Sequence, residues 1–488
     1  MKSLLSDAFN EFFAKAKEAF PQERTAARAW WLAVGMIVGW GRRTIGGAIR
    51  SCLQQFEDWS AKYRVFSRSP WEARELFQPA LDYCLGLGPK EAPFVVGLDD
   101  TSVKKTGKHI PKTSYLRDPM SPPFHVNLRW GQRFLQASAL IRPEGLHGPA
   151  RAIPIRFEPA PPPKKPGKRA KPEEIEAYRR ALKTENLSVK GVQTMEELRG
   201  RIPRERGLLC VVDGSFCNGH VFKHLPAGVE IVARARKDIR LYTPAEETLP
   251  HVGRKRLYGE ELPTPEEIRR DQKVPWQTAC VYGAGKIHQV RYKSLAPVLW
   301  RKGAGTKPLR LIVVAPLRYR PRKGAKLSYR DPAYLLTTDL RSPIDLVLQA
   351  AFDRWEIEVN HREEKSLMGV GQAQVRSVKS VGRVPQFVVA IYSFLLLASL
   401  KAFGPKRTDD YPPLPKWRKA EAVRRPSISD IVARFRQEMM VSVMEEPTFM
   451  RKNVRQKLAS RRKTGHGTTD KKSILNPVLA AFQTAPYG

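Results

Sequence analysis

Short apolar runs along the chain predict buried β-strands. Runs of about four to eight apolar residues between polar neighbours are typical of strands that are covered on both faces. Three such runs are Phe94–Leu98, Leu208–Val212 and Val229–Ala233. Val126–Trp130 and Arg133–Ile141 flank the dipeptide Gly131-Gln132, and this arrangement predicts a β-hairpin.

Helical spacing of apolar residues dominates the first 90 residues and returns from residue 173 onward. The segments with this spacing are Ser51–Phe66, Trp71–Leu85, Glu173–Lys183, Thr194–Arg199, Pro343–Met368, Phe387–Leu400 and Ile428–Met440. Pro79 is expected to kink or split the second of them. Gly41–Gly46 lies between N-terminal helical segments, as the turn of a helix-turn-helix would. Either a DNA contact or plain packing of a helical bundle fits that turn.

Changes in composition divide the chain into five expected regions. Residues 159–172, PAPPPKKPGKRAKP, form a Pro/Lys-rich linker that cannot pack a core. The stretch Ser460–Gly465, near the end of the chain, is expected to be disordered. The regions are an N-terminal helical DNA-binding domain (1–92), a first core part (93–237), a β-rich insertion (238–345, with Leu309–Val314 and Tyr334–Thr338 among its strands), a second core part (346–404) and a basic, partly disordered C-terminal region (405–488).

Charge is the most unusual feature of the composition. The 488 residues include 86 Lys and Arg against 48 Asp and Glu, a formal net charge of +38. A positive charge of this size calls for a polyanionic partner or an acidic surface. Because the basic residues run through the whole length, we expect a folded surface that follows a phosphate backbone. A ribosomal or lipid-bound basic protein is the alternative at this stage.

Cysteine usage and apolar length point to a cytoplasmic protein without a membrane span. The five cysteines form no CxxC pair and no zinc-finger spacing, so we expect reduced thiols and no structural zinc. The amphipathic N-terminus lacks the apolar core of a signal peptide. The apolar runs Ala29–Trp40 and Phe387–Leu400 are shorter than the roughly 18–20 residues that span a bilayer.

Three acidic positions end predicted strands. Asp99 and Asp100 end the first strand, and Asp213 ends the second. Acidic residues at the carboxyl ends of buried strands lie at the rim of a sheet, where α/β proteins place their sites. Two such strands side by side would bring two carboxylates to one hard cation such as Mg²⁺. The structural alternative is that each Asp caps a strand or begins a turn.

A predicted helix carries four polar residues on one face. The residues Arg354, Glu358, His361 and Lys365 are spaced 4, 3 and 4 apart. As a solvated stripe they would be ordinary ion pairs. Because the apolar residues Trp355, Ile357 and Val359 crowd the same turns, a face that lines a cleft explains the stripe better.

Together these residues resemble the DDE transposases of bacterial insertion sequences, in the group with a Tyr-x2-Arg-x3-Glu-x6-Lys signature. Arg354, Glu358 and Lys365 match its spacing, whereas the tyrosine position is Ala351, with Phe352 beside it. The two strand ends, Leu-Asp-Asp-Thr and Val-Asp-Gly-Ser, resemble the group's aspartate regions. Tyr63–Trp71 resembles a segment near the end of its N-terminal helical domain. The resemblance covers residues 30 to 400, approximately.

The resemblance implies an α/β fold, with an RNase H-like catalytic core, a mainly β insertion and an N-terminal all-helical domain. It implies a DNA transposase that cleaves strands at element ends and transfers the freed 3′-OH into target DNA. Asp99 or Asp100, together with Asp213 and Glu358, would hold two Mg²⁺ ions about 3.5–4 Å apart, with Mn²⁺ as a substitute. Side chains alternate along a strand, so only one of Asp99 and Asp100 is expected to face the metal, with Asp99 preferred.

The resemblance also implies DNA contacts and partners. Arg354 and Lys365 are suited to phosphates that flank the scissile bond. His361 either touches DNA or bridges Glu358 and Lys365, and Lys104, Lys105 and Lys108 are expected on the DNA backbone. The partners would be double-stranded DNA, as terminal inverted repeats and target, and a second copy in a homodimer, at the nucleoid in the cytoplasm.

Two other functions fit the same residues. One is a transposase-derived regulator that binds DNA without cleaving it. The other is an RNase H-type nuclease that cleaves but does not join. Because all three acidic positions are filled, the sequence favours an active enzyme.

Overall fold

The computed structural model describes residues 3–118, 121–122, 124–146, 148–245, 256–283, 285–320, 324–418 and 425–445. The chain forms two compact units. We call Met1–Ala14, Gln22–Val65 and Leu395–Gly488 the helical unit, and Lys15–Pro21 with Phe66–Phe394 the sheet unit. These units do not follow the predicted boundaries at residues 92 and 404, and the roles of the five regions stay predictions. The stretch Ser460–Gly465 lies outside the described residues.

The helical unit joins the two ends of the described chain. Its helices are α1 (Leu4–Ala16), α2 (Glu23–Val38), α3 (Ile45–Ser51), α4 (Trp59–Ser67), the last turns of α12 (Ser380–Phe403) and α13 (Ile428–Glu445). Phe9 of α1 packs edge-on against Phe435 of α13, with ring centroids 5.3 Å apart. The backbone N–H groups of Leu5 and Ser6 donate to the buried Glu438 carboxylate. These donors have no partner within α1, because the first N–H groups of a helix lack one, and Glu438 satisfies them.

The predicted turn Gly41–Gly46 connects α2 and α3. Thr44 caps α3 by accepting a hydrogen bond from the Gly47 N–H. The two helices cross so closely that a Cβ on Gly35 would lie 2.2 Å from the Ala48 carbonyl oxygen. The Arg43 guanidinium donates to carbonyl groups at the end of α2, among them Ile37 and Gly39. Arg43 therefore closes α2, and a DNA contact by this turn stays a prediction.

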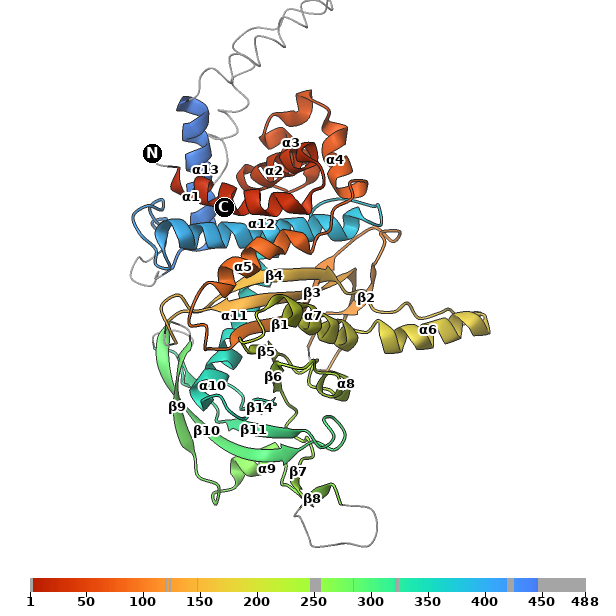
Figure 1. Cartoon of the computed structure of the whole chain (residues 1–488), viewed down its shortest axis with the longest axis vertical. Helices are drawn as coiled ribbons and strands as arrows, with labels where there is room; N and C mark the ends of the chain where they lie inside the picture. The colour runs from red at the N-terminus through yellow and green to blue at the C-terminus, as the bar shows by residue number, and fades with distance from the viewer. Residues whose placement is uncertain are drawn as a thin grey trace, which may run out of the picture. The chain divides into compact units, whose positions relative to one another are not determined.

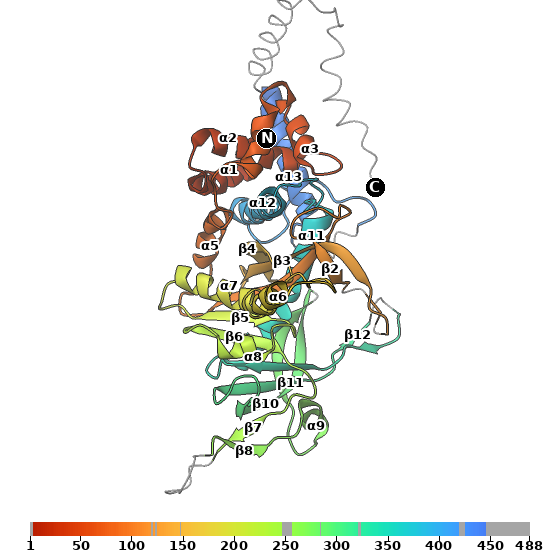
Figure 2. The same cartoon turned by 90° about the vertical axis from the view of Figure 1, so that its right-hand side faces the viewer.

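The sheet unit is built on one large mixed sheet (Figures 1 and 2). Its strands are β1 (Phe94–Lys104), β2 (Ser114–Arg117), β3 (Leu128–Ile141), β4 (Arg151–Pro159), β5 (Leu208–Val212), β6 (Val229–Arg234), β7 (Tyr242–Pro244), β8 (Tyr258–Glu261), β9 (Gln277–Gly283), β10 (Lys286–Leu299), β11 (Pro308–Val314) and β14 (Ala333–Thr337). β12 (Arg318–Tyr319) and β13 (Ser328–Tyr329) form a separate pair. Its helices are α5 (Gln78–Leu85), α6 (Pro172–Thr184), α7 (Leu187–Arg201), α8 (Gly219–Lys223), α9 (Pro265–Arg270), α10 (Ile344–Asp353), α11 (Trp355–Ser366) and most of α12.

Strand β1 is central to the arrangement. It pairs antiparallel with β3 on one side and parallel with β5 on the other, and β5 pairs parallel with β6. β4 continues the sheet beyond β3, and β14 pairs antiparallel with β6. The strands β7 to β11, from the predicted insertion, therefore extend the same sheet through β14.

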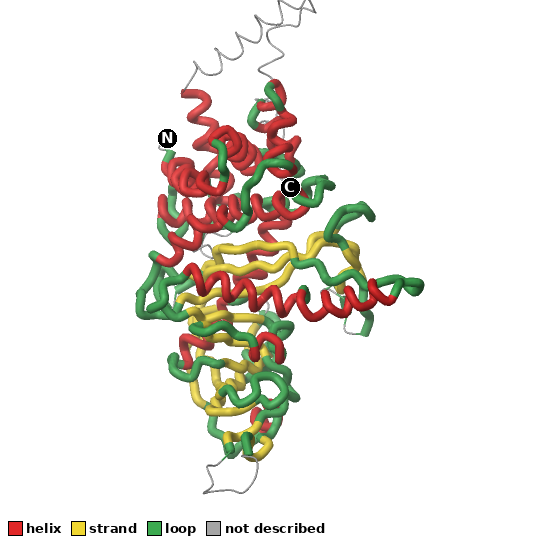
Figure 3. Tube along the Cα trace, turned by 45° about the vertical axis from the view of Figure 1, so that its right-hand side comes forward, coloured by secondary structure: helices red, strands yellow, loops and turns green. Residues whose placement is uncertain are grey.

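Helices cover the sheet in different ways. α10 and α11 pack on one face, where Val347 and Leu348 of α10 share a buried cluster with Leu209 and Val211 of β5. α6, by contrast, has no buried residue and projects from the sheet unit (Figure 3). α12 is long and apolar enough to cross a membrane, but 78% of its most apolar window is buried inside the protein. It packs as a core helix, as its sequence predicts.

Three predicted elements need correction. The predicted hairpin at Gly131-Gln132 is wrong, because β3 runs unbroken through both residues. The close approach of β1 and β3 leaves no room for a side chain at Gly131, because a Cβ at this position would lie 2.6 Å from the Val103 carbonyl oxygen. β1 does not end at Asp99 but continues to Lys104. Pro79 does not split a helix, since α5 begins at Gln78 and Pro79 occupies its first turn, where a missing N–H costs nothing.

Candidate active site

Strand register places Asp99 and Asp213 side by side. Leu98 pairs with Val212 in the parallel ladder of β1 and β5, and the next residues along the two strands are Asp99 and Asp213. Paired residues of neighbouring strands point to the same face of a sheet. Asp213 also begins a turn, as the structural alternative predicts: its Oδ1 accepts hydrogen bonds from the Ser215 N–H and hydroxyl. This turn holds the Asp213 carboxylate at the edge of the sheet.

The face that carries Asp99 is the face covered by α11. Gly97, two residues before Asp99, lies directly beneath Ile357 of α11. Gln136, the partner of Asp99 in β3, points to the same side. Asp100 points to the opposite face, with Leu135 as its partner. The sequence left the choice between the two aspartates open, and the fold turns Asp99 toward α11.

Arg354 connects two of the three acidic positions. It lies at the junction of α10 and α11, where its backbone stays helical between the two helices. Its Nη1 donates to Asp99 Oδ2 and its Nη2 donates to Glu358 Oε1, each at 2.9 Å. The Arg354 and Asp99 side chains are 19% and 14% exposed, and Glu358 is 36% exposed. Asp99 and Glu358 thus flank one guanidinium in a half-buried site.

The electrostatics of Asp99 reflect crowding by like charge. Burial raises the pKa of Asp99 to about 7, and the Asp213, Asp100 and Glu358 carboxylates add to this rise, whereas Arg354 opposes it. Asp213 and Glu358 are therefore both close enough to act on Asp99. The two other acidic positions that the sequence selected, Asp213 and Glu358, therefore act electrostatically on Asp99.

Asp100 has a different environment. Burial raises its pKa as well, with Asp213 contributing, while Arg133 and Lys365 oppose the shift. Arg133 stands opposite Ser102 in the ladder of β1 and β3, on the Asp100 face of the sheet. The sequence reasoning missed Arg133, because its position beside Asp100 depends on a strand register that no local pattern predicts.

Lys365 and His361 occupy different surroundings on α11. Burial lowers the pKa of Lys365, and the Asp99 and Asp100 carboxylates act on it in the opposite direction. Lys365 thus faces the acidic cluster. His361 is buried, and burial together with Lys365 and Arg354 lowers its pKa to about 3, so its ring is neutral at pH 7. A buried neutral imidazole is poorly suited to a phosphate or to bridging Glu358 as a cation.

The two lysines after Asp100 also differ. Lys104 is exposed at the end of β1. Lys105 donates its ammonium group to the Gly371 carbonyl oxygen at 2.9 Å, and burial lowers its pKa. Lys104 is open to a phosphate backbone, whereas Lys105 ties the end of β1 to the loop after α11.

A buried ion pair holds the end of α10, one residue before Arg354. Arg142 Nε donates to Asp353 Oδ2 at 2.6 Å, and Gln349 Nε2 donates to Asp353 Oδ1 at 2.9 Å. Burial raises the pKa of Asp353 to about 6, with Arg142 opposing the rise. Because Arg142 follows the end of β3, this pair anchors the helix junction to the sheet. No local sequence pattern indicates this ion pair.

The chemistry of the donor set fits a hard divalent cation. Carboxylate oxygens are the protein ligands that Mg²⁺ prefers. Among the described residues, no three His, Cys, Asp or Glu side chains stand close enough together to hold an ion. The Arg354 guanidinium lies between Asp99 and Glu358 and donates a hydrogen bond to each. All five cysteines are free and take no part in the site.

Comparison with known proteins is consistent with this geometry. No curated protein matches the chain. The sequence profile of the family described as "DDE superfamily endonuclease" matches residues 17–307, more than half of the 488 residues. The match includes both aspartate strand ends but stops before Arg354, Glu358 and Lys365. This family consists of nucleases that act on DNA with divalent metal ions. The chain belongs to the DDE superfamily endonuclease family.

Proposed function

We propose that this protein is a DDE-type DNA transposase, which cleaves DNA strands at the ends of an element and joins the freed 3′-OH to target DNA. The observation that carries the proposal is that Arg354 bridges Asp99 and Glu358, while the register of β1 and β5 puts Asp213 next to Asp99. We assign Asp99, not Asp100, to the metal, because Asp99 shares a face of the sheet with Asp213 and α11.

Each residue then has a defined task. Asp99, Asp213 and Glu358 would hold two Mg²⁺ ions, which supply an activated water for cleavage and stabilise the leaving 3′ oxygen. Arg354 bridges Asp99 and Glu358 and, with ions held by these carboxylates, would be free to offer a bidentate contact to a pair of phosphate oxygens. Lys365 contributes a compact positive charge beside the same carboxylates. The freed 3′-OH replaces water as nucleophile, one phosphodiester bond replaces another, and no ATP is needed.

We further propose that β1, β3, β4, β5 and β6 form an RNase H-like core. The mixed pairing supports this: β4-β3-β1 is antiparallel, and β1-β5-β6 is parallel. The two aspartates come from adjacent central strands, and the glutamate comes from a helix on one face. The strands β7 to β11 would be an insertion that extends the sheet of the core through β14.

Cleavage can be tested on a supercoiled plasmid that carries the gene with the DNA that flanks it on both sides. We expect nicking that depends on Mg²⁺ or Mn²⁺ and maps to inverted ends of the insert. Glu358→Gln should abolish nicking and leave DNA binding intact. Glu356→Gln is the matched control, because it removes one carboxylate from the same turn of α11 on another face. Equal cleavage by the parent and Glu358→Gln would refute the metal assignment.

The products separate transposition from the two alternatives. A transposase gives joined molecules in which the cut end is linked to a second DNA. A nuclease without strand transfer gives nicked or linear DNA alone, and a regulator gives a shifted DNA band with no cleavage. Pairing of the two ends by a homodimer predicts that a complex with two copies of the chain forms before the second end is cut.

A further inference from the structure

A basic ribbon extends β1 and β3 beyond the candidate active site. We define this ribbon as residues 101–136; it comprises the end of β1, β2 and the first part of β3. It holds seven Lys and Arg residues and one acidic residue, Asp118. Asp118 already forms an ion pair with Arg129, with Oδ1 3.8 Å from Nη1. The ribbon therefore carries excess positive charge in a segment that begins immediately after Asp100.

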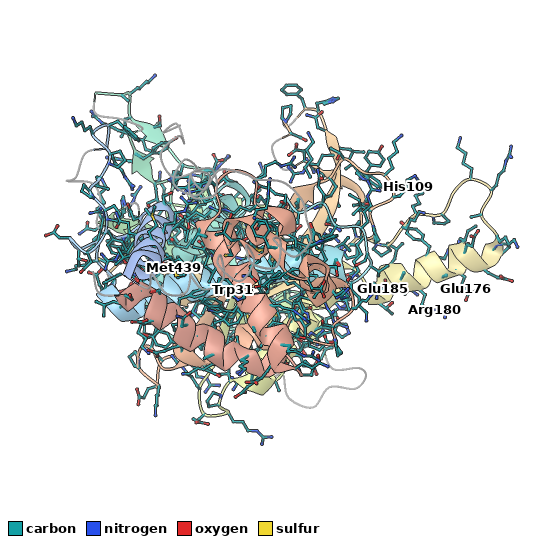
Figure 4. The ribbon with its side chains drawn as sticks, turned by 90° about the horizontal axis from the view of Figure 1, so that it is seen from above. Trp31, His109, Glu176, Arg180, Glu185 and Met439 are labelled. Atoms are coloured by element: carbon teal, nitrogen blue, oxygen red, sulfur yellow. The ribbon has the colours of Figure 1, made fainter. Side chains whose placement is uncertain are left out.

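The positive side chains of the ribbon are largely open to solvent. Lys104, Lys108 and Arg117 are exposed, and so is His109 in the loop between β1 and β2. Figure 4 shows His109 at the same end of the sheet unit as α6, whose Glu176 and Arg180 point outward. Exposed cations with few acidic neighbours favour a polyanion over a neutral or basic protein surface.

Two aromatic rings lie among these charges. Tyr115 of β2 pairs with Trp130 of β3, and their ring centroids lie 5.0 Å apart in an edge-to-face arrangement. The Trp130 indole N–H donates to the Gly107 carbonyl oxygen at 3.0 Å, which fixes that ring. Tyr115 is 66% exposed. A large ring held on one side and open on the other is a surface on which another flat ring can stack.

Strand register gives the distance from this aromatic pair to the active site. Gly131 pairs with Lys104, and Leu135 pairs with Asp100. Trp130 therefore lies five residues before Leu135, or roughly 17 Å at a rise of about 3.4 Å per residue. One strand of B-DNA covers roughly the same length in about five nucleotides. A DNA strand whose cleaved phosphate lies beside Asp99 can thus reach Tyr115 within a few nucleotides.

Bases in an intact duplex stack on each other and offer no free face, so the aromatic pair selects for unpaired DNA. We propose that Tyr115, supported by Trp130, stacks on an unpaired nucleobase of the DNA end, while Arg117 on the same face of β2 and Lys108 in the loop between β1 and β2 bind its phosphates. This inference rests on the proposed DNA-cleaving function. Stacking of a base on an aromatic side chain is strong enough that removing a single ring can lower the affinity by about tenfold.

The test compares a blunt 30-base-pair duplex with the same duplex ending in a five-nucleotide fork, both bound by the full-length protein without divalent ions. We expect the parent to prefer the fork. Tyr115→Ala should lose about tenfold in affinity for the fork and leave the blunt duplex unchanged. Tyr115→Phe keeps the ring and should bind as the parent does. Tyr329→Ala is the matched control, since Tyr329 of β13 is an exposed tyrosine elsewhere, 56% exposed.

A fluorescent base reports stacking directly. 2-Aminopurine placed in the fork should lose fluorescence on binding to the parent and to Tyr115→Phe, but not to Tyr115→Ala. Equal affinity of the parent for fork and blunt duplex overturns the inference. The inference is also overturned if Tyr115→Ala loses affinity equally for the fork and the blunt duplex, or if it still quenches the 2-aminopurine fluorescence. Unchanged affinity of Tyr115→Ala for the blunt duplex excludes a general loss of folding in that variant.

The two proposals fail in different ways. A parent that cleaves the plasmid in Mg²⁺ but shows no preference for the fork refutes the stacking site alone. A parent that neither binds nor cleaves DNA refutes the proposed function as well, and the stacking site with it.

Discussion

Gly97 of β1 and Ile357 of α11 lie so close that no side chain fits between them. A Cβ on Gly97 would lie 2.3 Å from Ile357 Cδ1, well inside van der Waals contact. This close approach brings α11 down onto the strand that carries Asp99. We therefore expect the 2.9 Å contact between Arg354 Nη1 and Asp99 Oδ2 to be sensitive to a side chain added two residues earlier.

Gly97→Ala should separate α11 from β1 and weaken both stability and catalysis. Overpacking of this kind lowers the free energy of unfolding by about 1–3 kcal/mol. Cleavage should also fall, because Glu358 and Arg354 move away from Asp99. Thermal unfolding and plasmid nicking measure the two effects. Adding Ile357→Val removes Cδ1 and leaves Cγ1 at 3.3 Å from the new Cβ. The double variant should therefore regain part of the lost thermal stability and part of the lost nicking activity. A stable, fully active single variant would show that the contact does not position the helix.

Arg354→Gln should make the protein more dependent on divalent ions for stability. The change removes the cation that pairs with the Asp99 carboxylate. In the absence of metal this should lower the free energy of unfolding by about 1–3 kcal/mol. Mg²⁺ then replaces the lost positive charge, so the melting temperature should rise further with Mg²⁺ in the variant than in the parent. Arg362→Gln, an exposed position on the same helix, is the control. Identical Mg²⁺ responses in all three proteins would count against competition between Arg354 and the metal.

Metal affinity should increase with pH up to about pH 7. Burial raises the pKa of Asp99 to about 7, and Asp213, Asp100 and Glu358 add to the rise. Below that pH the carboxyl group is protonated, and each bound ion must displace a proton, so affinity falls by up to about tenfold per pH unit. Above it the carboxylate is already charged and the dependence levels off. Calorimetry in two buffers of different ionisation enthalpy should show proton release at pH 6 and little at pH 8.5.

In the same calorimetric experiment, Asp99→Asn serves as the control. It should bind Mg²⁺ weakly and without proton release at either pH. An affinity of the parent that stays constant between pH 6 and pH 8.5 would contradict the prediction.

Glu364 should make the folded protein less stable as pH rises. Its side chain is 1% exposed, and burial raises its pKa to about 8, with Gln136 and Lys365 opposing the shift. The folded state therefore holds a proton that the unfolded state loses above its ordinary pKa of 4.5. Because the folded state binds more protons, stability falls as pH rises from about 5 through 8, by up to a few kcal/mol.

Melting temperatures at pH 5.5, 7 and 8.5 measure this effect. Glu364→Gln should flatten the pH dependence and raise the melting temperature at pH 8.5, whereas Glu176→Gln, on the exposed helix α6, should change neither. A parent whose melting temperature does not fall with pH would show that Glu364 ionises freely in the fold.

The elements that could be predicted from sequence are those whose residues alone determine the structure. Leu208–Val212 forms β5 with the predicted bounds, because five consecutive apolar residues can only be buried. The predicted apolar helix Phe387–Leu400 is confirmed as part of α12, which begins earlier, at Ser380, and ends at Phe403. β3 could not be predicted, because a Gly-Gln pair that is typical of a turn serves here to let β1 approach. That constraint comes from a neighbour elsewhere in the chain.

The candidate site shows the same division. Arg354 and Glu358 were found from helical spacing, and their contact is a local i, i+4 ion pair. The orientation of Asp99 could not be decided from the sequence, because it depends on the register between β1 and β5. Arg133, Arg142 and Glu364 were missed for the same reason: each acts on a residue that is brought close only by the tertiary fold.

The hydrogen bonds from Leu5 and Ser6 to Glu438 join positions up to 433 residues apart. At about 5–20 residues per second, a ribosome needs roughly 20–90 s to translate that interval. The nascent α1 must wait that long for its acceptor, whereas every strand of the large sheet has already emerged. Translation therefore completes the sheet first and the helical unit last, so a shortened polypeptide that stops before α13 would keep every strand of the sheet and the candidate active site but leave its first helix uncapped.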